Sequence, residues 1–273
     1  MMSYWLTFKS GLSTFYKHRT LIVEMSKREI FGRYRGQFGG FAWSFLNPLI
    51  MLGVYTFFFS IVFKARWGAS LRETHTDYAL ILFVGLITFG FFSECIGRGS
   101  HLITTNVNFV KKIVFPLEVL PGIALGTALF HACISFCTLL VAQVILTGHL
   151  PWTIIFIPIV FAPFLLMTLG FLWFLSATGV YIRDINQITG FLLPILMFVS
   201  PIFVPISVFP EYFQSFVYIN PLTFVVEEMR NLMIFGVLPN FFNLVIYLII
   251  SLSIAVLGLT WFQKTKSGFA DVL

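Results

Sequence analysis

Long apolar runs alternate with short polar segments along this chain. The first run covers 38–63, which is 26 residues without an Asp, Glu, Lys, Arg or His. A helix of about 20 apolar residues crosses a hydrocarbon core of roughly 30 Å. Further apolar runs cover 78–93, 119–150, 152–182, 185–209 and 241–262. The pattern therefore predicts an all-α membrane protein with six transmembrane helices in one domain over 38–262.

The 37 residues ahead of the first run have a different pattern. Leu12, Phe15, Ile22 and Met25 recur at helical spacing, with charged residues between them. Such spacing is typical of an amphipathic helix in the plane of the lipid headgroups. Because a secretory n-region is only a few residues long, we expect the segment to remain on the chain. We predict a cytosolic, amphipathic segment over 1–37; the alternative is a basic flank that only sets the topology.

The stretch 208–240, between the fifth and sixth runs, is too polar to span a membrane and too apolar for a solvated loop. Many aromatic and aliphatic residues there surround Glu211, Glu227, Glu228 and Arg230. We expect short re-entrant helices at the outer leaflet, whose backbone polar groups bond to protein or water. The alternative is an amphipathic loop that lies over the spans.

Positive charge orients the predicted spans. With the amino terminus inside, 13 of the 17 Lys and Arg residues fall on the cytosolic side, and Lys64, Arg66, Arg72 and Arg230 fall outside. Cytosolic loops of membrane proteins carry the excess of Lys and Arg. Both termini, a connection over 98–116 and a tail over 263–273 are therefore expected in the cytosol.

Composition agrees with a membrane location. The chain is 58% hydrophobic and only 10% charged, against about a quarter in an average soluble domain, and its mean hydropathy is +0.93. This excludes a soluble globular enzyme. The net charge of +6 is attributed to membrane topology and not to nucleic-acid binding, because the apolar runs leave no soluble basic domain.

No catalytic or metal-binding motif is found. The chain has no P-loop, HExxH or GxSxG motif, and Cys95, Cys133 and Cys137 lack metal-ligand spacing. Glu94 and Glu118 fall at the cytosolic edges of predicted spans, where solvated charge is the simple expectation. His131 is deep in the third span, and we expect a packing residue without a charged partner at similar depth.

Aromatic residues make up 18% of the chain and offer two interpretations. Most belong to lipid-facing surfaces and interfacial belts in any membrane protein. Some rings on two of the spans are nevertheless candidates for a path along which sugars slide by stacking: Trp43, Tyr55, Trp173 and Tyr181.

Short motifs in a consistent order give a family resemblance. Residues 28–48 read REIFGRYRGQFGGFAWSFLNP and resemble the RD(I/L)xxRYxxSxLGxxWxxxxP opening of membrane subunits of type-2 ABC polysaccharide exporters. Residues 106–121, NVNFVKKIVFPLEVLP, resemble that family's NxxLVxKxxFPxExLP segment. Shorter matches are YIRDI at 181–185, SPI at 200–202, NPL at 220–222 and GFADVL at 268–273. Glu29 replaces the usual Asp, and FGG at 38–40 replaces a small residue followed by Leu-Gly.

The resemblance implies a homodimeric permease that works with two copies of a cytosolic P-loop ATPase. ATP and Mg would bind to the partner, so this chain would have no cofactor and no enzymatic activity of its own. The implied ATPase-coupling residues are Asn106, Phe109, Lys111, Lys112 and Phe115. Arg33, Tyr34 and Arg35 become candidates for meeting an anionic, lipid-linked substrate, since guanidinium groups pair with phosphate. A basic anchor at the membrane surface is the alternative for these three residues.

The expected function is export of a lipid-linked capsule or O-antigen polysaccharide across a bacterial inner membrane. An exporter of the same type for a drug, a lipo-oligosaccharide or teichoic acid is the nearest alternative. An ATP-independent flippase or a membrane glycosyltransferase is a more distant one, and should show paired carboxylates near a membrane face.

Overall fold

The computed structural model describes residues 13–62, 67, 75–111 and 115–273, and its regular elements are all helices. The prediction of an all-α protein is thus confirmed for this part of the chain. The helices are α2 (Arg19–Tyr34), α3 (Trp43–Tyr55), α4 (His75–Gly99), α5 (Val107–Lys111), α6 (Leu120–Thr147), α7 (Ile157–Tyr181), α8 (Ile185–Val199), α9 (Glu211–Ile219), α10 (Pro221–Arg230), α11 (Phe241–Thr265) and α12 (Phe269–Val272).

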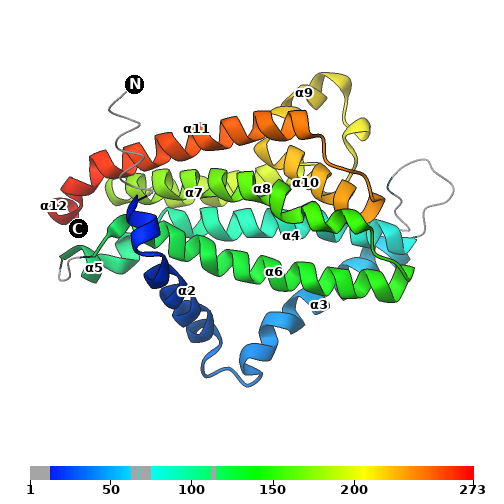
Figure 1. Cartoon of the computed structure of the whole chain (residues 1–273), viewed down its shortest axis with the longest axis horizontal. Coiled ribbons are helices and arrows are strands. Elements are labelled where there is room, and N and C mark those ends of the chain that lie inside the picture. The colour runs from blue at the N-terminus through cyan, green and yellow to red at the C-terminus, as the bar shows by residue number, and fades with distance from the viewer. Residues whose placement is uncertain (1–12, 63–66, 68–74, 112–114) are drawn as a thin grey trace.

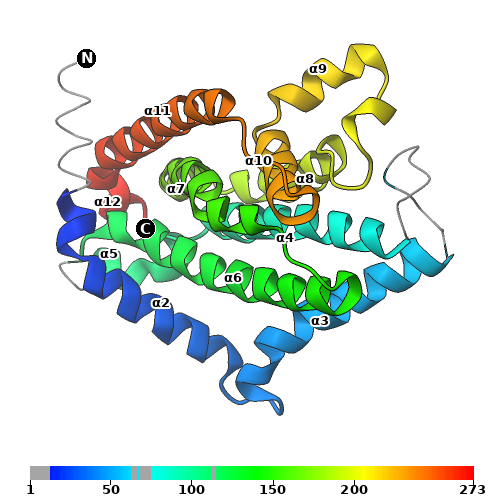
Figure 2. The same ribbon diagram turned by 45° about the vertical axis from the view of Figure 1, so that its right-hand side comes forward.

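Four long helices, α4, α6, α7 and α11, lie side by side as the body of the molecule (Figure 1). The tightest pair is α7 with α11, where a Cβ on Gly170 would lie 2.7 Å from the carbonyl oxygen of Ile254. The carboxyl terminus, α5 and the start of α2 lie at one end of this bundle, and α9 lies toward the other (Figures 1 and 2).

Helices α2 and α3 form a V below the bundle (Figure 2). The chain turns between them at Gly36 and Gly40, which have φ angles of 84° and 47°. Glycine adopts positive φ without the steric cost that a Cβ imposes. The V encloses space against α4 and α6, and this space contains the candidate site.

In the part of the chain that the structure describes, five helical segments are long and apolar enough to cross a membrane: Gly40–Phe59, Tyr78–Gly99, Leu117–Thr147, Trp152–Tyr181 and Phe241–Val272. They correspond to five of the six predicted spans. The remaining predicted span, over 185–209, is not confirmed, because α8 ends at Val199. Its 15 residues extend only about 22 Å, short of a hydrocarbon core of roughly 30 Å.

The sequence after α8 explains why this helix stops. Ser200 has an extended backbone, and Pro201 has no N–H with which to continue the helix. Arg230, the last residue of α10, is completely buried and donates hydrogen bonds to the carbonyl oxygens of Pro201, Ile202 and Ile81. These bonds hold the chain after α8 against α4, so a buried charge fixes the bend.

The stretch 208–240 contains the short helices that its composition predicts. Helix α10 packs on α4 and α7 and buries Leu222, Val225, Val226 and Met229, whereas α9 lies toward the surface. A π-helical turn, Asn231–Phe235, follows α10. The re-entrant placement of these helices in a membrane remains a prediction.

The amino-terminal segment is helical, but a simple amphipathic pattern is not confirmed. Helix α2 packs on α6 and buries Ser26, Ile30 and Tyr34, which lie one turn apart on one face. Val23 and Phe31 are more than half exposed. The buried face of α2 is therefore partly polar, and part of its apolar surface is open; Leu12 lies outside the described residues.

Candidate functional site

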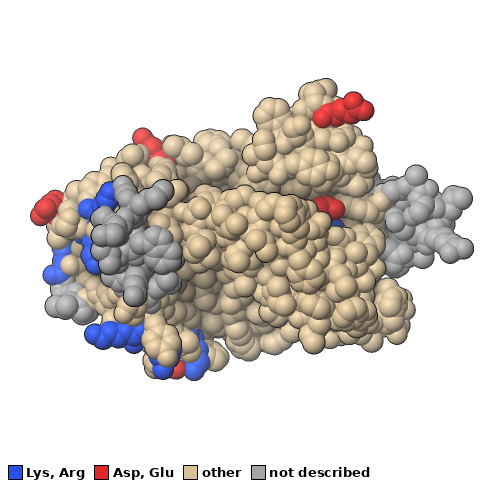
Figure 3. Space-filling view, turned by 45° about the horizontal axis from the view of Figure 1, so that its top comes forward, with Lys and Arg blue, Asp and Glu red and all other residues tan. Residues whose placement is uncertain are grey.

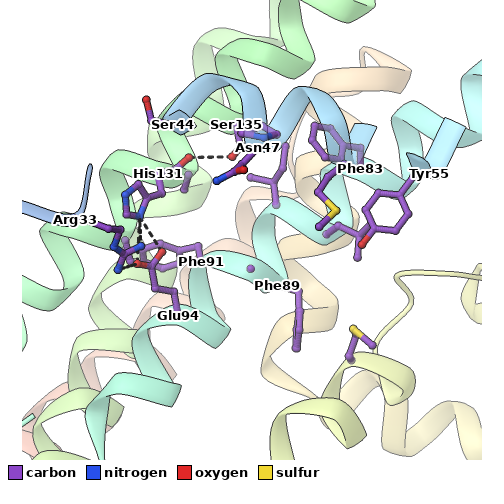
Figure 4. A pocket seen from close by; sticks show the side chains of 18 of the residues that line it. Arg33, Ser44, Asn47, Tyr55, Phe83, Phe89, Phe91, Glu94, His131 and Ser135 are labelled. Atoms are coloured by element: carbon purple, nitrogen blue, oxygen red, sulfur yellow. Dashed lines mark hydrogen bonds and ion pairs between the residues drawn. The ribbon is translucent and has the colours of Figure 1, made fainter. Parts of the chain in front are cut away.

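A cavity of about 460 Å³ lies inside the V formed by α2 and α3. Helices α4 and α6 form its far wall, and Met197 of α8 contributes at one end. Figure 4 shows Arg33, Glu94 and His131 gathered at the α2 end, and Phe83 and Tyr55 at the opposite end. The apolar part of the lining includes Met51, Phe83, Leu86, Ile87 and Phe89. The cavity is thus amphipathic along its length.

Three charged or titratable side chains from three helices meet at the polar end (Figure 4). Arg33 Nη2 of α2 lies 2.8 Å from Glu94 Oε1 of α4. His131 Nδ1 of α6 lies 3.1 and 3.0 Å from the two oxygens of Glu94. Arg33 Nη1 also lies 3.3 Å from His131 Nδ1, so the three side chains contact one another. In the tautomer that carries a proton on Nδ1, this nitrogen donates to the Glu94 carboxylate.

These contacts correct two expectations. His131 is not a lone histidine, since Glu94 and Arg33 lie at its own depth. Glu94 is not a freely solvated edge residue, because only 21% of its side chain is exposed. Within the described part of the chain, His131 Nε2 is buried without a hydrogen-bond partner. Position along one span could not reveal this group, because its members come from separate helices.

Tyr34 is buried next to the His131 ring and also lines the cavity. Its ring makes edge-to-face contacts with His131 and Phe41, at centroid distances of 6.2 and 5.9 Å. Burial raises the pKa of Tyr34; Arg33 opposes this effect, and Glu94 adds to it. The tyrosine therefore stays neutral and acts here as a packing residue beside the ion pair.

The other residues proposed for a substrate path are dispersed. Tyr55 lines the apolar end of the cavity, whereas Trp43 and Arg35 do not line it. Trp173 is 1% exposed, and its Nε1 donates to the carbonyl oxygen of Glu118 at 3.0 Å. Tyr181 donates to the carbonyl oxygen of Thr265 at 2.7 Å. The structure therefore brings Arg33, Tyr34 and Tyr55 to one cavity and gives Trp173 and Tyr181 packing contacts elsewhere.

The proposed coupling residues lie at the end of the bundle that carries α5. Phe109 and Phe115 stack with their ring centroids 4.6 Å apart, and both pack against the protein's own core. Asn106 donates from its side chain to the carbonyl oxygen of Leu102. Lys111 is exposed at the end of α5, and Lys112 lies outside the described residues.

Glu118 also differs from the sequence-based expectation of a solvated edge residue. It is 6% exposed, and its carboxylate accepts from Lys266 Nζ at 3.2 Å. The pair ties the start of α6 to the carboxyl-terminal tail. It could not be predicted from spacing, since the two residues are 148 positions apart.

Within the described residues, no group of three His, Cys, Asp or Glu side chains is arranged to hold a metal ion. The charged groups at the cavity pair with one another instead. Membrane-length helices around an amphipathic cavity define a polytopic membrane protein with a cavity between its helices.

Comparison with known proteins identifies the family. Residues 20–234 match the ABC-2 type transporter family, and the chain belongs to it. The O-antigen export system permease protein RfbA of Myxococcus xanthus is 28% identical over 258 residues, which cover 94% of this chain and 96% of the relative. A protein of the same name from Klebsiella pneumoniae is 26% identical, with 93% and 95% covered. The polysialic acid transport protein KpsM of Escherichia coli is 26% identical, with 85% and 86% covered.

The chain is therefore an ABC-2 permease, homologous to O-antigen export permeases and to a polysialic acid transport protein. Its membrane-length helices and these relatives make it a multi-pass inner-membrane protein with a role in transport.

Proposed function

We propose that this chain is the membrane subunit of an ATP-driven exporter that moves a lipid-linked polysaccharide, such as a capsule or O-antigen chain, out of the cytosol. The observation that carries the proposal is the similarity to an O-antigen export permease over almost the full length of both chains. ATP and Mg would bind to a partner ATPase, and this chain would break no bond.

The connection between α4 and α6 is the proposed contact with the ATPase. Helix α5 presents Lys111 to solvent, and the stacked pair Phe109 and Phe115 links α5 to the packed core. A push on this segment would therefore reach the bundle through packed side chains. Two copies of the ATPase and two copies of this chain are the proposed assembly.

The cavity suits a lipid-linked anion in its chemistry. A guanidinium group forms charge-assisted hydrogen bonds with phosphate, and 41% of the Arg33 side chain is exposed. The apolar part of the cavity lining, which includes Met51, Phe83 and Ile87, suits a hydrocarbon chain. We assign Arg33 to the anionic group and the aromatic end at Tyr55 to the remainder of the ligand.

Two measurements test this function. The tagged chain, extracted gently from its native membrane, should co-purify with a P-loop ATPase in equal amount. Deletion of the gene should remove a surface polysaccharide while its lipid-linked form accumulates inside, and the wild-type gene should restore export. Reproducible absence of the ATPase from an intact, folded preparation would contradict the ATP-driven mechanism. Retention of all surface polysaccharides would contradict the substrate class and favour a different cargo.

A further inference from the structure

Two ion pairs connect α2 with α4 in a regular pattern. Arg33 of α2 pairs with Glu94 of α4 at 2.8 Å, and Glu29 of α2 pairs with Arg98 of α4. On each helix the Glu precedes the Arg by four residues, which places both side chains on one face, one turn apart. Because each Glu meets the Arg of the other helix, the helices run antiparallel and the pairs form two rungs of a ladder.

The ladder specifies the register of the two helices. A shift of α2 by one turn along α4 would place Arg33 opposite Arg98 in one direction, or Glu29 opposite Glu94 in the other. Like charges in contact oppose such a shift. The side chains are 21–41% exposed, so the charges are less screened than those of a fully solvated pair.

Helix α2 is also held sideways against α6. Ser26 Oγ donates to the carbonyl oxygen of Ile123 at 3.2 Å, and a Cβ on Gly126 would lie 2.7 Å from that hydroxyl oxygen. His131 of α6 bonds to Glu94, so one rung of the ladder joins all three helices. The end of α2 that carries Arg33 leads into the glycine turn, after which α3 takes a different direction (Figure 2).

We propose that this ladder of Glu29–Arg98 and Arg33–Glu94 makes α2 and α4 move as one unit, and so transmits displacement of α2 to the wall of the cavity. The inference rests on the proposed function, since it takes the partner ATPase to contact and displace α2 as well as the α5 segment. Helix α3 follows the glycine turn and takes a different direction, so displacement of α2 and α4 relative to α3 would change the width of the cavity. Arg33 and Glu94 line the cavity, so the transmitting contact is also part of its polar end.

Charge reversal on the rung outside the cavity lining tests the transmission. The variants are Glu29→Arg, Arg98→Glu and the double reversal, each studied in the complete transporter with its ATPase. We expect each single reversal to lower polysaccharide export about tenfold, which is typical of a lost coupling between sites. Chain abundance, ATPase association and ATP hydrolysis should persist. The double reversal should restore export to near the wild-type value.

Glu24 and Lys27 provide a matched control, because this 2.9 Å pair lies within α2 and its side chains are 62% and 57% exposed. Glu24→Lys and Lys27→Glu should leave export unchanged, singly and together. If single ladder reversals reduce abundance or ATPase association in proportion to export, the ladder is only a structural support and the proposal is wrong. Failure of the double reversal to restore export at normal abundance would overturn it as well.

A covalent replacement for the rung gives an independent measurement. The background is a chain in which Cys95, Cys133 and Cys137 are replaced by Ala. In it, the double variant Glu29→Cys and Arg98→Cys removes the ion pair and supplies two thiols at the same positions. A short bismaleimide should then join the two helices and recover the lost export. Cross-linking without recovery would mean that the helices must separate, which contradicts transmission as a unit. Absence of an ATPase from the wild-type preparation would instead overturn the proposed function.

Discussion

At the residue scale, two buried charged residues of α10, Glu228 and Arg230, differ in how well their polar atoms are hydrogen-bonded. Arg230 is fully buried and uses its donors on three carbonyl oxygens and Glu227, with the Trp67 ring 4.1 Å from its Cζ. Burial lowers the pKa of Arg230 to about 10, so it stays charged at neutral pH. Glu228 is 7% exposed, and its Oε2 has no hydrogen-bond partner within the described residues.

Glu228 should therefore make stability depend on pH. Burial raises its pKa, with the Asn240 backbone and the Asn231 side chain opposing the shift. At pH values below the unfolded pKa the carboxyl is protonated in both states, and folding carries no penalty. As pH rises, the unfolded state loses its proton first, and the folded state becomes relatively less stable.

Replacing Glu228 by Gln should remove this penalty. We expect Glu228→Gln to stabilise the purified protein by about 1 kcal/mol at neutral pH, and to have no effect near pH 4. Thermal unfolding in detergent across that pH range measures the difference. Glu211→Gln, at an exposed position of α9, is the control and should change nothing. An equal effect of Glu228→Gln at every pH would contradict titration as the cause.

At the element scale, the short tail after α11 is an integral part of the bundle. Phe269 of α12 is fully buried, with its ring 5.6 Å from Phe262 and 6.0 Å from Tyr181. A Cβ on Gly268 would lie 2.6 Å from the Tyr181 hydroxyl, so a glycine is needed for this approach. Lys266 adds the ion pair with Glu118. The tail thus connects α7 and α11 with the segment between α5 and α6.

Truncating the buried ring should loosen this end of the molecule. Phe269→Ala removes a fully buried side chain, and such changes cost about 3 kcal/mol or more. We expect a lower thermal midpoint and faster proteolysis of the α5 segment. Val272→Ala is the matched control, because Val272 is 46% exposed. Equal stability of the two variants would show that the tail contributes little to packing.

At the scale of the whole molecule, charge is concentrated at one end. Figure 3 shows Lys and Arg gathered near α2, α5 and α12, while most of the remaining visible surface is uncharged. Many large apolar side chains on α3, α8 and α11 are exposed in the single chain, among them Phe45, Phe191 and Phe242. Such a surface suits lipid or a second copy, with the basic end in the cytosol.

Site-directed labelling tests that orientation. In a cysteine-free chain, Tyr212→Cys on α9 should react with a membrane-impermeant maleimide in intact cells. Asp271→Cys in α12 should react only after the membrane is permeabilised. The cysteine-free parent is the control for background labelling. The reverse pattern would place the carboxyl terminus outside and contradict the positive-inside assignment.

Hydrophobic patterning alone determined the all-helical class, five of the membrane-length helices and the short helices within 208–240. These features depend on local composition, because any apolar run of sufficient length must satisfy its backbone hydrogen bonds internally in lipid. Motifs spread along the whole chain also gave the transporter family, which the comparisons confirm. The fifth run is not confirmed as a span, because α8 ends before Ser200 and Pro201, and the bend that follows is held by hydrogen bonds from the distant Arg230.

Only the tertiary structure decided which charges are partners. The spacing of Glu29 with Arg33 and of Glu94 with Arg98 was readable in the sequence, but nothing there showed that the two helices face each other. Likewise, the ion pair of His131 with Glu94 and the hydrogen bond of the buried Trp173 to Glu118 join segments that are distant along the chain. Helix formation follows from neighbours in sequence, whereas burial and charge pairing follow from the way the helices pack.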